Sequence, residues 1–281
     1  MFTFSFPIKI KSFNAKKLLL LGLTLILSGC ASKELLQAQP AMVQSQAENL
    51  LPQRTDKADL YFVGFAADSS IGVFRKEVTY SQQLFDDKFG TEGRSVALIN
   101  SSQTSDQLPM ATAENLDATL KAVGKIIDPE QDVVFLFLTG HGAYSQGVVT
   151  DYWPHHQGLI EPKMLKESLN QAGIKWKVVV VSACFSGQFA DELADLYTLV
   201  ITASNPNQPS FGCTSGADFT YFGEAFFKDQ LTQTTNFEEA FLLAKAAITE
   251  RENNMGFDNS YPTMRTTKRI SDKLNALFSQ P

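Results

Sequence analysis

The stretch that decides the fold is Val133-Val134-Phe135-Leu136-Phe137-Leu138, which runs directly into Thr139-Gly140-His141-Gly142. Six consecutive apolar residues, with a glycine two residues after the last of them, are typical of a strand that is buried on both faces. Such a strand needs helices on both sides of its sheet. The run therefore predicts a central strand of an α/β protein.

Outward from this run, apolar stretches alternate with segments of helical periodicity. This order predicts a mostly parallel sheet with right-handed crossovers. We expect further strands at Leu60–Phe65, Ser95–Asn100, Lys177–Ser182 and Leu199–Thr202, an edge hairpin at Val149–Trp153, and helices at Val73–Phe89, Thr112–Ile127, Glu161–Ala172, Phe219–Leu231, Asn236–Asn253 and Asp272–Phe278.

Composition limits the class of protein. A chain of 281 residues that is 44% hydrophobic and 19% charged fits one mid-sized domain and excludes a disordered or collagen-like protein. Lys and Arg number 24 against 30 Asp and Glu, and four of the lysines precede residue 30. The acidic remainder argues against a nucleic-acid partner.

The N-terminus has the pattern of a targeting segment. Its four lysines precede a short leucine-rich run, and the run ends in Leu27-Ser28-Gly29-Cys30. This tetrad resembles a bacterial lipobox, in which the cysteine thiol receives lipid and the chain is cut before it. We expect residues 1–29 to be a lipoprotein signal peptide and Cys30 to carry fatty acyl chains such as palmitate, which would hold the protein on a membrane.

The domain organisation follows from this processing site. Residues 30–57, rich in Gln, Ala and Ser, predict a flexible tether with at most two helical turns between Val43 and Leu51. Residues 58–281 would then form the folded domain. Ala31 after the cysteine favours the outer membrane of a bacterial envelope, facing the periplasm.

Two reactive side chains follow neighbouring strands of the predicted sheet. His141 lies just past the central run, and Cys184 follows Lys177–Ser182. The carboxyl ends of parallel strands meet at one edge of a sheet, which is where ligands bind. A cysteine nucleophile needs an imidazole and backbone N–H groups for the oxyanion, which Gly142 and Cys184 itself can supply.

Two other kinds of site could use residues of this region. Metal binding would recruit His155, His156 and Cys213, but no compact ligand spacing occurs. A dinucleotide site would need a third glycine where Ser145 stands. The sequence therefore favours neither of these two kinds of site.

Three motifs in order resemble the legumain-like cysteine peptidases, the C13 family of the caspase-like clan, and specifically its bacterial lipoprotein members. They are Phe137-Leu138-Thr139-Gly140-His141-Gly142, Val181-Ser182-Ala183-Cys184-Phe185-Ser186-Gly187, and the loop from Ile201 to Cys213. The resemblance implies a caspase-like three-layer α/β sandwich over roughly Leu60 to Leu231. It also implies catalysis by Cys184 and His141, with an oxyanion hole at Gly142 and Cys184 and with no metal and no organic cofactor.

The resemblance also implies a pocket for an Asn or Asp side chain before the scissile bond. By motif position its substrate-binding residues are Arg75, Ser182, Ser210 and Glu224. Ser182 and Phe185 stand where the family carries acids, and Val73 stands where it carries an asparagine. With fewer acids near Arg75, the pocket is expected to shift toward Asp.

The resulting hypothesis is a membrane-tethered cysteine endopeptidase acting on protein or peptide substrates. Two alternatives stay open: a transpeptidase or transamidase that uses the same acyl-enzyme, and a non-catalytic envelope lipoprotein that keeps the fold. Cys213 is expected to be a half-buried thiol in the pocket loop, and its oxidation with Cys184 is an open question. The sequence also leaves the oligomeric state open.

Overall fold

The apolar run forms strand β3 (Val133–Thr139), in which all seven residues are buried. It lies in a computed structural model that describes residues 33–279, so the predicted signal peptide and the lipidation site Cys30 fall outside the described residues. The chain divides into two units between Gln37 and Ala38, and β3 belongs to the second unit, from Ala38 onward, together with all the elements named below.

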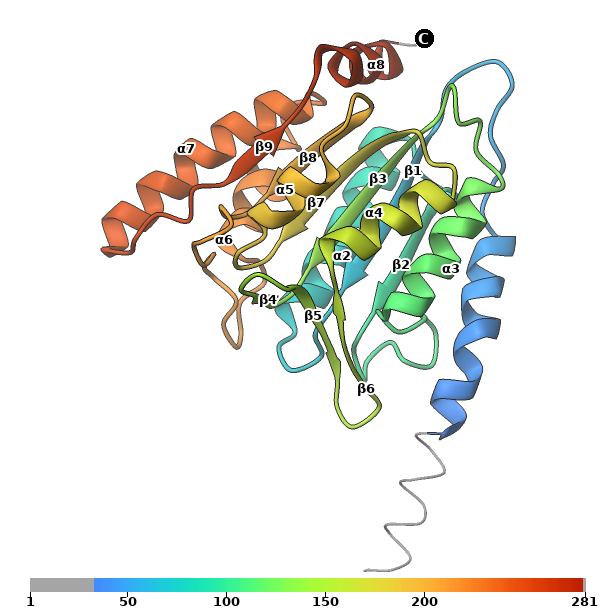
Figure 1. The fold of residues 1–281 in the computed structure, drawn as a ribbon, viewed down its shortest axis with the longest axis horizontal. Helices are drawn as coiled ribbons and strands as arrows, with labels where there is room; N and C mark the ends of the chain where they lie inside the picture. The colour runs from blue at the N-terminus through green and yellow to red at the C-terminus, as the bar shows by residue number, and fades with distance from the viewer. Residues whose placement is uncertain (1–32, 280–281) are drawn as a thin grey trace, which may run out of the picture. The chain divides into compact units, whose positions relative to one another are not determined.

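The central sheet has six strands in the order β2-β1-β3-β7-β8-β9, of which only β9 runs antiparallel to its neighbour. Figure 1 shows helices in front of this sheet and behind it. This is the predicted three-layer α/β sandwich with a mostly parallel sheet. The remaining strands of the sheet are β1 (Leu60–Ala66), β2 (Ser95–Ile99), β7 (Trp176–Ser182), β8 (Thr198–Thr202) and β9 (Thr263–Arg265).

The helices divide between the two faces according to the alternation of side chains along the strands. Phe135 and Phe137 of β3 face one apolar cluster, and Val134 and Leu136 face the other. The first face is covered by α2 (Val73–Phe89), α6 (Tyr221–Gly223), the π-helix η1 (Glu224–Gln230), α7 (Phe237–Met255) and α8 (Lys268–Phe278). The second is covered by α3 (Ala113–Gly124), α4 (Pro162–Gln171) and α5 (Gly187–Leu193).

The helix ends follow local sequence signals. Helix α2 stops at Gly90, whose φ of 71° is the left-handed conformation that glycine adopts without cost. Helix α3 begins at Thr112, whose side chain accepts a hydrogen bond from the backbone N–H of Asn115. These caps explain why both boundaries could be predicted within a few residues.

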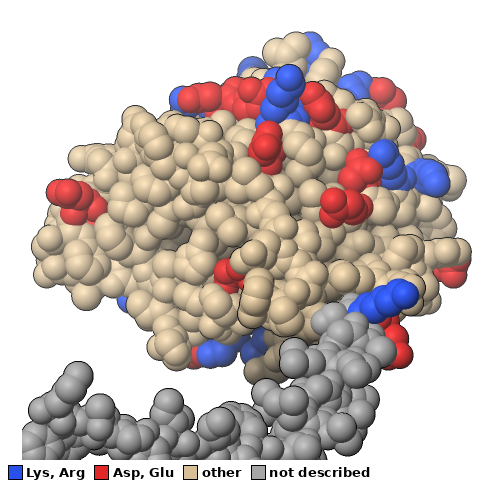
Figure 2. Space-filling model, turned by 60° about the horizontal axis from the view of Figure 1, so that its bottom comes forward, with Lys and Arg blue, Asp and Glu red and all other residues tan. Residues whose placement is uncertain are grey.

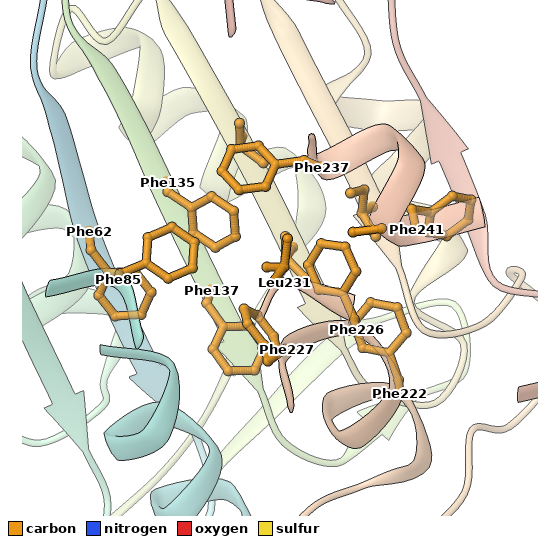
Figure 3. Packing of buried hydrophobic residues seen from close by; sticks show 14 of the residues in the cluster. Phe62, Phe85, Phe135, Phe137, Phe222, Phe226, Phe227, Leu231, Phe237 and Phe241 are labelled. Atoms are coloured by element: carbon orange, nitrogen blue, oxygen red, sulfur yellow. The ribbon is translucent and has the colours of Figure 1, made fainter. Parts of the chain in front are cut away.

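Phenylalanine dominates the core between the sheet and α2, η1 and α7 (Figure 3). The Phe85 ring packs against several of the other rings, with its centroid 4.3 Å from that of Phe135 and 4.9 Å from that of Phe62. Aromatic pairs at such separations add to the free energy gained by burial. The core on this side therefore depends on a few large rings.

Phe85→Ala is expected to lower the free energy of unfolding by about 3–5 kcal/mol, because it leaves a ring-sized cavity in a packed cluster. Urea unfolding followed by circular dichroism measures this loss. Phe257→Ala, at a ring that is 39% exposed, is the control and should cost about 1 kcal/mol or less. Equal losses in the two variants would show that the cluster does not dominate stability.

Two of the predicted elements need correction, and two short elements were not predicted. The hairpin is not an edge of the main sheet: β5 (Gly147–Tyr152) pairs with β4 (Gly142–Ala143) and β6 (His156–Ile160) in a sheet of their own. The single helix predicted at Phe219–Leu231 starts later and is mostly π-helical. Helix α5 and strand β9 were missed, because each is too short for a clear period.

The segment predicted as a flexible tether is helical at least over residues 38–48. Val43 and Leu50 are buried in the cluster that also holds α3, and the Gln39 side chain accepts a hydrogen bond of 2.7 Å from the backbone N–H of Met110. The reason is that a few well-spaced apolar residues suffice when a neighbouring helix offers a matching surface. Ordered structure therefore begins well before residue 58.

Candidate active site

Cys184 lies two residues beyond the end of β7, on a sharp turn. The next residue, Phe185, has a φ of 57°, an uncommon conformation for a residue with a Cβ, and its N–H donates to the Gln208 carbonyl at 2.9 Å. The Cys184 side chain is partly exposed. The turn thus leaves the thiol at the surface, at the carboxyl edge of the sheet.

The thiol rests against the loop that follows β8. The Ser210 N–H donates to Cys184 Sγ at 3.3 Å, and the thiol donates in turn to the Ser210 carbonyl at 3.5 Å. The Ser210 hydroxyl lies 3.9 Å from the same sulfur. Ser210, predicted as a pocket residue, therefore lies directly beside the predicted nucleophile.

His141 lies two residues beyond the end of β3, the strand that pairs with β7. Its ring is half-buried and packs edge-on against the Phe74 ring of α2, with centroids 5.1 Å apart. Its carbonyl accepts from the N–H of Val149 at 2.8 Å. Helix α2 therefore packs against the imidazole, and strand β5 holds the backbone of His141.

Gly142 brings the two motifs into contact. A Cβ built at this glycine would lie 1.7 Å from the Cys184 carbonyl oxygen and 3.0 Å from its nitrogen. Only glycine allows such an approach, so the backbones of the histidine and cysteine motifs touch here. The structure thus brings His141, Gly142, Cys184 and Ser210 to one place, as the sequence predicts.

Ser182 is buried two residues before the cysteine and faces inward. Its hydroxyl lies 3.2 Å from that of Thr220, the residue that caps α6. Thr220 also donates to the Glu77 carboxylate, from both its N–H and its hydroxyl, at 2.7 Å each. Ser182 is therefore joined to a buried carboxyl group of α2 rather than exposed to a pocket.

The two predicted charged pocket residues differ in their surroundings. Arg75 is half-buried on α2, and its guanidinium has no ion pair or hydrogen bond with any residue of the described range 33–279. Glu224 forms ion pairs of 2.9 Å with both Lys228 and Arg251, and these two partners hold the pKa of its carboxyl below the ordinary value. Arg75 thus has a charge to offer a ligand, whereas that of Glu224 is already paired.

Glu77 is the residue of this region that sequence reasoning missed. It is fully buried on α2, one turn from Phe74, and also accepts from the Thr139 hydroxyl at 2.6 Å. The sequence does carry a signal, because Glu77 falls on the face of α2 that is otherwise formed by apolar and small residues. An acid on such a face needs partners that periodicity alone does not reveal.

Burial raises the pKa of Glu77, outweighing the hydrogen bonds from Thr139 and Thr220, which act to lower it. A carboxyl group with a raised pKa in the folded state contributes stability below its unfolded pKa of about 4.3, and this contribution is lost as the pH rises through the folded pKa. Gln at this position does not titrate. As the pH rises, the wild type should therefore lose unfolding free energy relative to Glu77→Gln, so that the variant becomes relatively more stable.

Urea unfolding of the two proteins at intervals between pH 4 and pH 8 measures this trend. Taking the difference at each pH removes the contribution of all other titrating groups. If the difference stays constant with pH, or if the wild type becomes relatively more stable as the pH rises, the raised pKa of Glu77 in the folded state is contradicted.

Cys213, the third cysteine, is half-buried in the same loop as Ser210, and both it and Cys184 are free thiols. Burial, followed by the nearby Cys184, raises the pKa of Cys213. It is therefore a poorer nucleophile at neutral pH than an ordinary cysteine.

Two further properties concern metal binding and membrane spans over residues 33–279. Within that range, no cluster of three or more His, Cys, Asp or Glu side chains is arranged to hold a metal ion. None of the helices described there is long and apolar enough to cross a membrane.

Comparison with known proteins adds one finding. A family model described as the Peptidase C13 family matches residues 113–272, more than half of the chain. The match includes His141, Gly142, Cys184 and Ser210, and it begins after Arg75 and Glu77. No curated protein matches the chain.

Proposed function

The chain belongs to the peptidase C13 family, the legumain-like cysteine peptidases, and we propose on this premise that it is a membrane-tethered cysteine endopeptidase that cleaves after Asn or Asp. The observation that carries the proposal is the contact of Gly142 with Cys184. It joins the histidine motif to the cysteine motif at the carboxyl edge of the sheet, where such sites are built.

In the proposed reaction Cys184 is the nucleophile and His141 the general acid and base. The thiolate attacks the carbonyl carbon of the scissile bond, and the N–H groups of Gly142 and Cys184 stabilise the resulting oxyanion. The imidazolium then gives its proton to the departing amine, which leaves an acyl-enzyme on the sulfur. Water, deprotonated by the imidazole, hydrolyses the thioester and restores the thiol.

Arg75 is proposed to select the side chain before the scissile bond. Its lack of a partner among residues 33–279 supports this role, since a guanidinium pairs well with a carboxylate or an amide oxygen. Glu224 is a weaker candidate, because it would have to give up Lys228 or Arg251 to bind substrate. We therefore expect peptides with Asp before the scissile bond to be cleaved better than those with Asn, and equal cleavage of the two would contradict this expectation.

The surroundings of the site also suit a peptide chain. A groove of about 440 Å³ is lined by residues of the β4–β5 turn, the end of β6, the start of α4 and α5, and the turn and α5 each follow one of the two catalytic motifs in the chain. Figure 2 turns the hairpin end of Figure 1 toward the viewer and shows few charged side chains in the middle of this face. A nucleic acid requires a continuous positive surface, and Figure 2 shows none on this face.

The decisive experiment uses full-length protein and an acyloxymethyl-ketone peptide ending in Asn or Asp, with the adduct located by mass spectrometry. We expect one adduct on Cys184 in the wild type and in Cys213→Ala, and none in Cys184→Ala. The raised pKa of Cys213 makes it a suitable internal control, because labelling there would indicate nonspecific alkylation. A folded, reduced wild type without an adduct would instead support the non-catalytic lipoprotein.

A second assay separates hydrolysis from transpeptidation. A peptide with an internal Asp or Asn is incubated with and without an excess of a second peptide that has a free amine, and the masses of the products are measured by mass spectrometry. Hydrolysis gives only the acid product, whereas a joined peptide that increases with amine concentration identifies the transferase.

The membrane tether is tested at Cys30. Cells expressing the wild type or Cys30→Ser are fed an alkyne analogue of palmitate and fractionated. We expect the label and the membrane association in the wild type only. Equal membrane association of both proteins would show that lipid on Cys30 is not the anchor.

A further inference from the structure

The strands that carry the two catalytic motifs end side by side. Thr139, the last residue of β3, is the register partner of Ser182, the last residue of β7. Each side chain points to the face of the sheet on which α2 lies, and each precedes its catalytic residue by two positions. Any group that binds these two hydroxyls therefore also fixes the positions of the backbone segments that lead into His141 and Cys184.

Glu77 of α2 is that group. One carboxylate oxygen accepts from the Thr139 hydroxyl at 2.6 Å, and the other accepts from the Thr220 N–H and hydroxyl at 2.7 Å each. Because the only hydroxyl hydrogen of Thr220 goes to Glu77, Ser182 donates to Thr220 over 3.2 Å. One carboxyl group therefore links the histidine strand, the cysteine strand and the start of α6.

The space around this carboxyl group is closed. Glu77 is 0% exposed, and a Cβ at Gly223 would lie 1.9 Å from its Oε1. The same helix contacts the imidazole through Phe74, and it contacts the segment just before α6 through an ion pair of 2.7 Å between Lys76 and Asp218. A shift of α2 relative to β3 would thus be passed to several parts of the site at once.

We propose that Glu77 is a positioning residue of the peptidase, which fixes His141 relative to Cys184 by holding Thr139 and, through Thr220, Ser182. It does not touch the substrate. The inference rests on the proposed function, and it adds a residue that lies outside the matched family region.

The chain offers a matched control at the opposite end of the same strand. Asp132, which directly precedes β3, is also a buried carboxyl group, 1% exposed, and accepts from the N–H groups of Asp59 and Asp128 at 2.7 and 2.8 Å. Its loss should destabilise the fold without moving the catalytic pair. The variants to compare are therefore Glu77→Leu with Asp132→Leu, and Glu77→Gln with Asp132→Asn.

Glu77→Leu is expected to lower kcat at least about 100-fold with KM changed less than about threefold, since a misplacement near 1 Å costs about that much in rate. Glu77→Gln should keep kcat within about tenfold of the wild type. Its oxygen can still accept from Thr220 and its amide can donate to the Thr139 oxygen. Asp132→Leu should lose thermal stability and keep kcat within about twofold.

If Glu77→Leu does not fold, Thr139→Val tests the hydrogen bond between β3 and Glu77. This variant removes the hydroxyl and leaves a side chain of nearly the same shape. It should lower kcat at least about tenfold with the wild-type circular dichroism spectrum, because it releases the histidine strand from α2.

Either of two results would overturn the inference alone: an active wild type in which the Glu77 and Asp132 variants lose kcat equally, or full activity of both Glu77→Leu and Thr139→Val. A wild type that neither labels nor turns over would overturn the proposed function, and the inference with it.

Discussion

His141→Ala is expected to lower kcat/KM by about 10³-fold or more while leaving the fold intact. The imidazole is proposed to stabilise the thiolate and to protonate the leaving amine, and general acid–base catalysis of this kind contributes about 10²–10⁴-fold. The ring is half-buried at the sheet edge and contacts Phe74 only at its edge, so its removal leaves no large internal cavity. The measurement is turnover of a peptide with an internal Asp or Asn.

The chain contains its own controls for this variant. It has three histidines, and the other two lie in the β5–β6 hairpin, where His155 packs on Tyr152 and His156 shares a hydrogen bond of 2.8 Å with Thr150. His155→Ala and His156→Ala should each keep kcat/KM within about threefold. If His156→Ala were as damaging as His141→Ala, the assignment of the catalytic base would be wrong.

Gly142→Ala is expected to lower kcat by about 10²–10³-fold. A methyl group at this position would lie 1.7 Å from the Cys184 carbonyl oxygen, so the two motifs must separate. The proposed oxyanion donor moves with them, and the loss of one such donor costs about 10²–10³-fold in rate.

Gly124→Ala is the matched control for the backbone clash. Its Cβ would lie 1.9 Å from the Ala172 carbonyl oxygen, at the end of α3 and away from both motifs. Both variants should be less stable to heat, but only Gly142→Ala should lose kcat. Equal kcat values would mean that the Gly142 approach serves the fold and not the chemistry.

Much of the fold could be predicted because the central strands are continuous apolar runs. Strands β1, β3 and β7 lie where the sequence places them, to within one residue at either end. Helix α2 was predicted at both ends, and its C-terminal end is marked by Gly90, which stops it in a left-handed conformation that suits glycine. These signals are local, so they need no knowledge of the partner elements.

The elements that were missed or misjudged depend on their neighbours. Residues 38–48 carry little helical signal, yet Val43 packs beside α3 and Gln39 bonds to Met110. The π-helix η1 lies within the segment that was expected to be an α-helix, and its Phe226 and Phe227 are buried in the core. Neither choice is set by a local period.

The candidate site divides in the same way. His141, Gly142, Cys184 and Ser210 were found because they follow strands in recognisable motifs, and the carboxyl ends of parallel strands meet by topology. Glu77 and Thr220 are 143 residues apart in the chain and belong to no such motif. Their contact exists only because α2 and α6 cover the same face of the sheet.

The sequence by itself determined the order of the main strands and helices and the side chains that lie at the sheet edge, because burial patterns and glycine positions are properties of short segments. Only the tertiary structure decided which charges are free. Arg75 has no partner within the described residues, Glu224 is paired twice, and Glu77 is buried among hydroxyls. The reason is physical: the free energy of a charge depends on the groups that surround it in space, and folding brings those groups from distant parts of the chain.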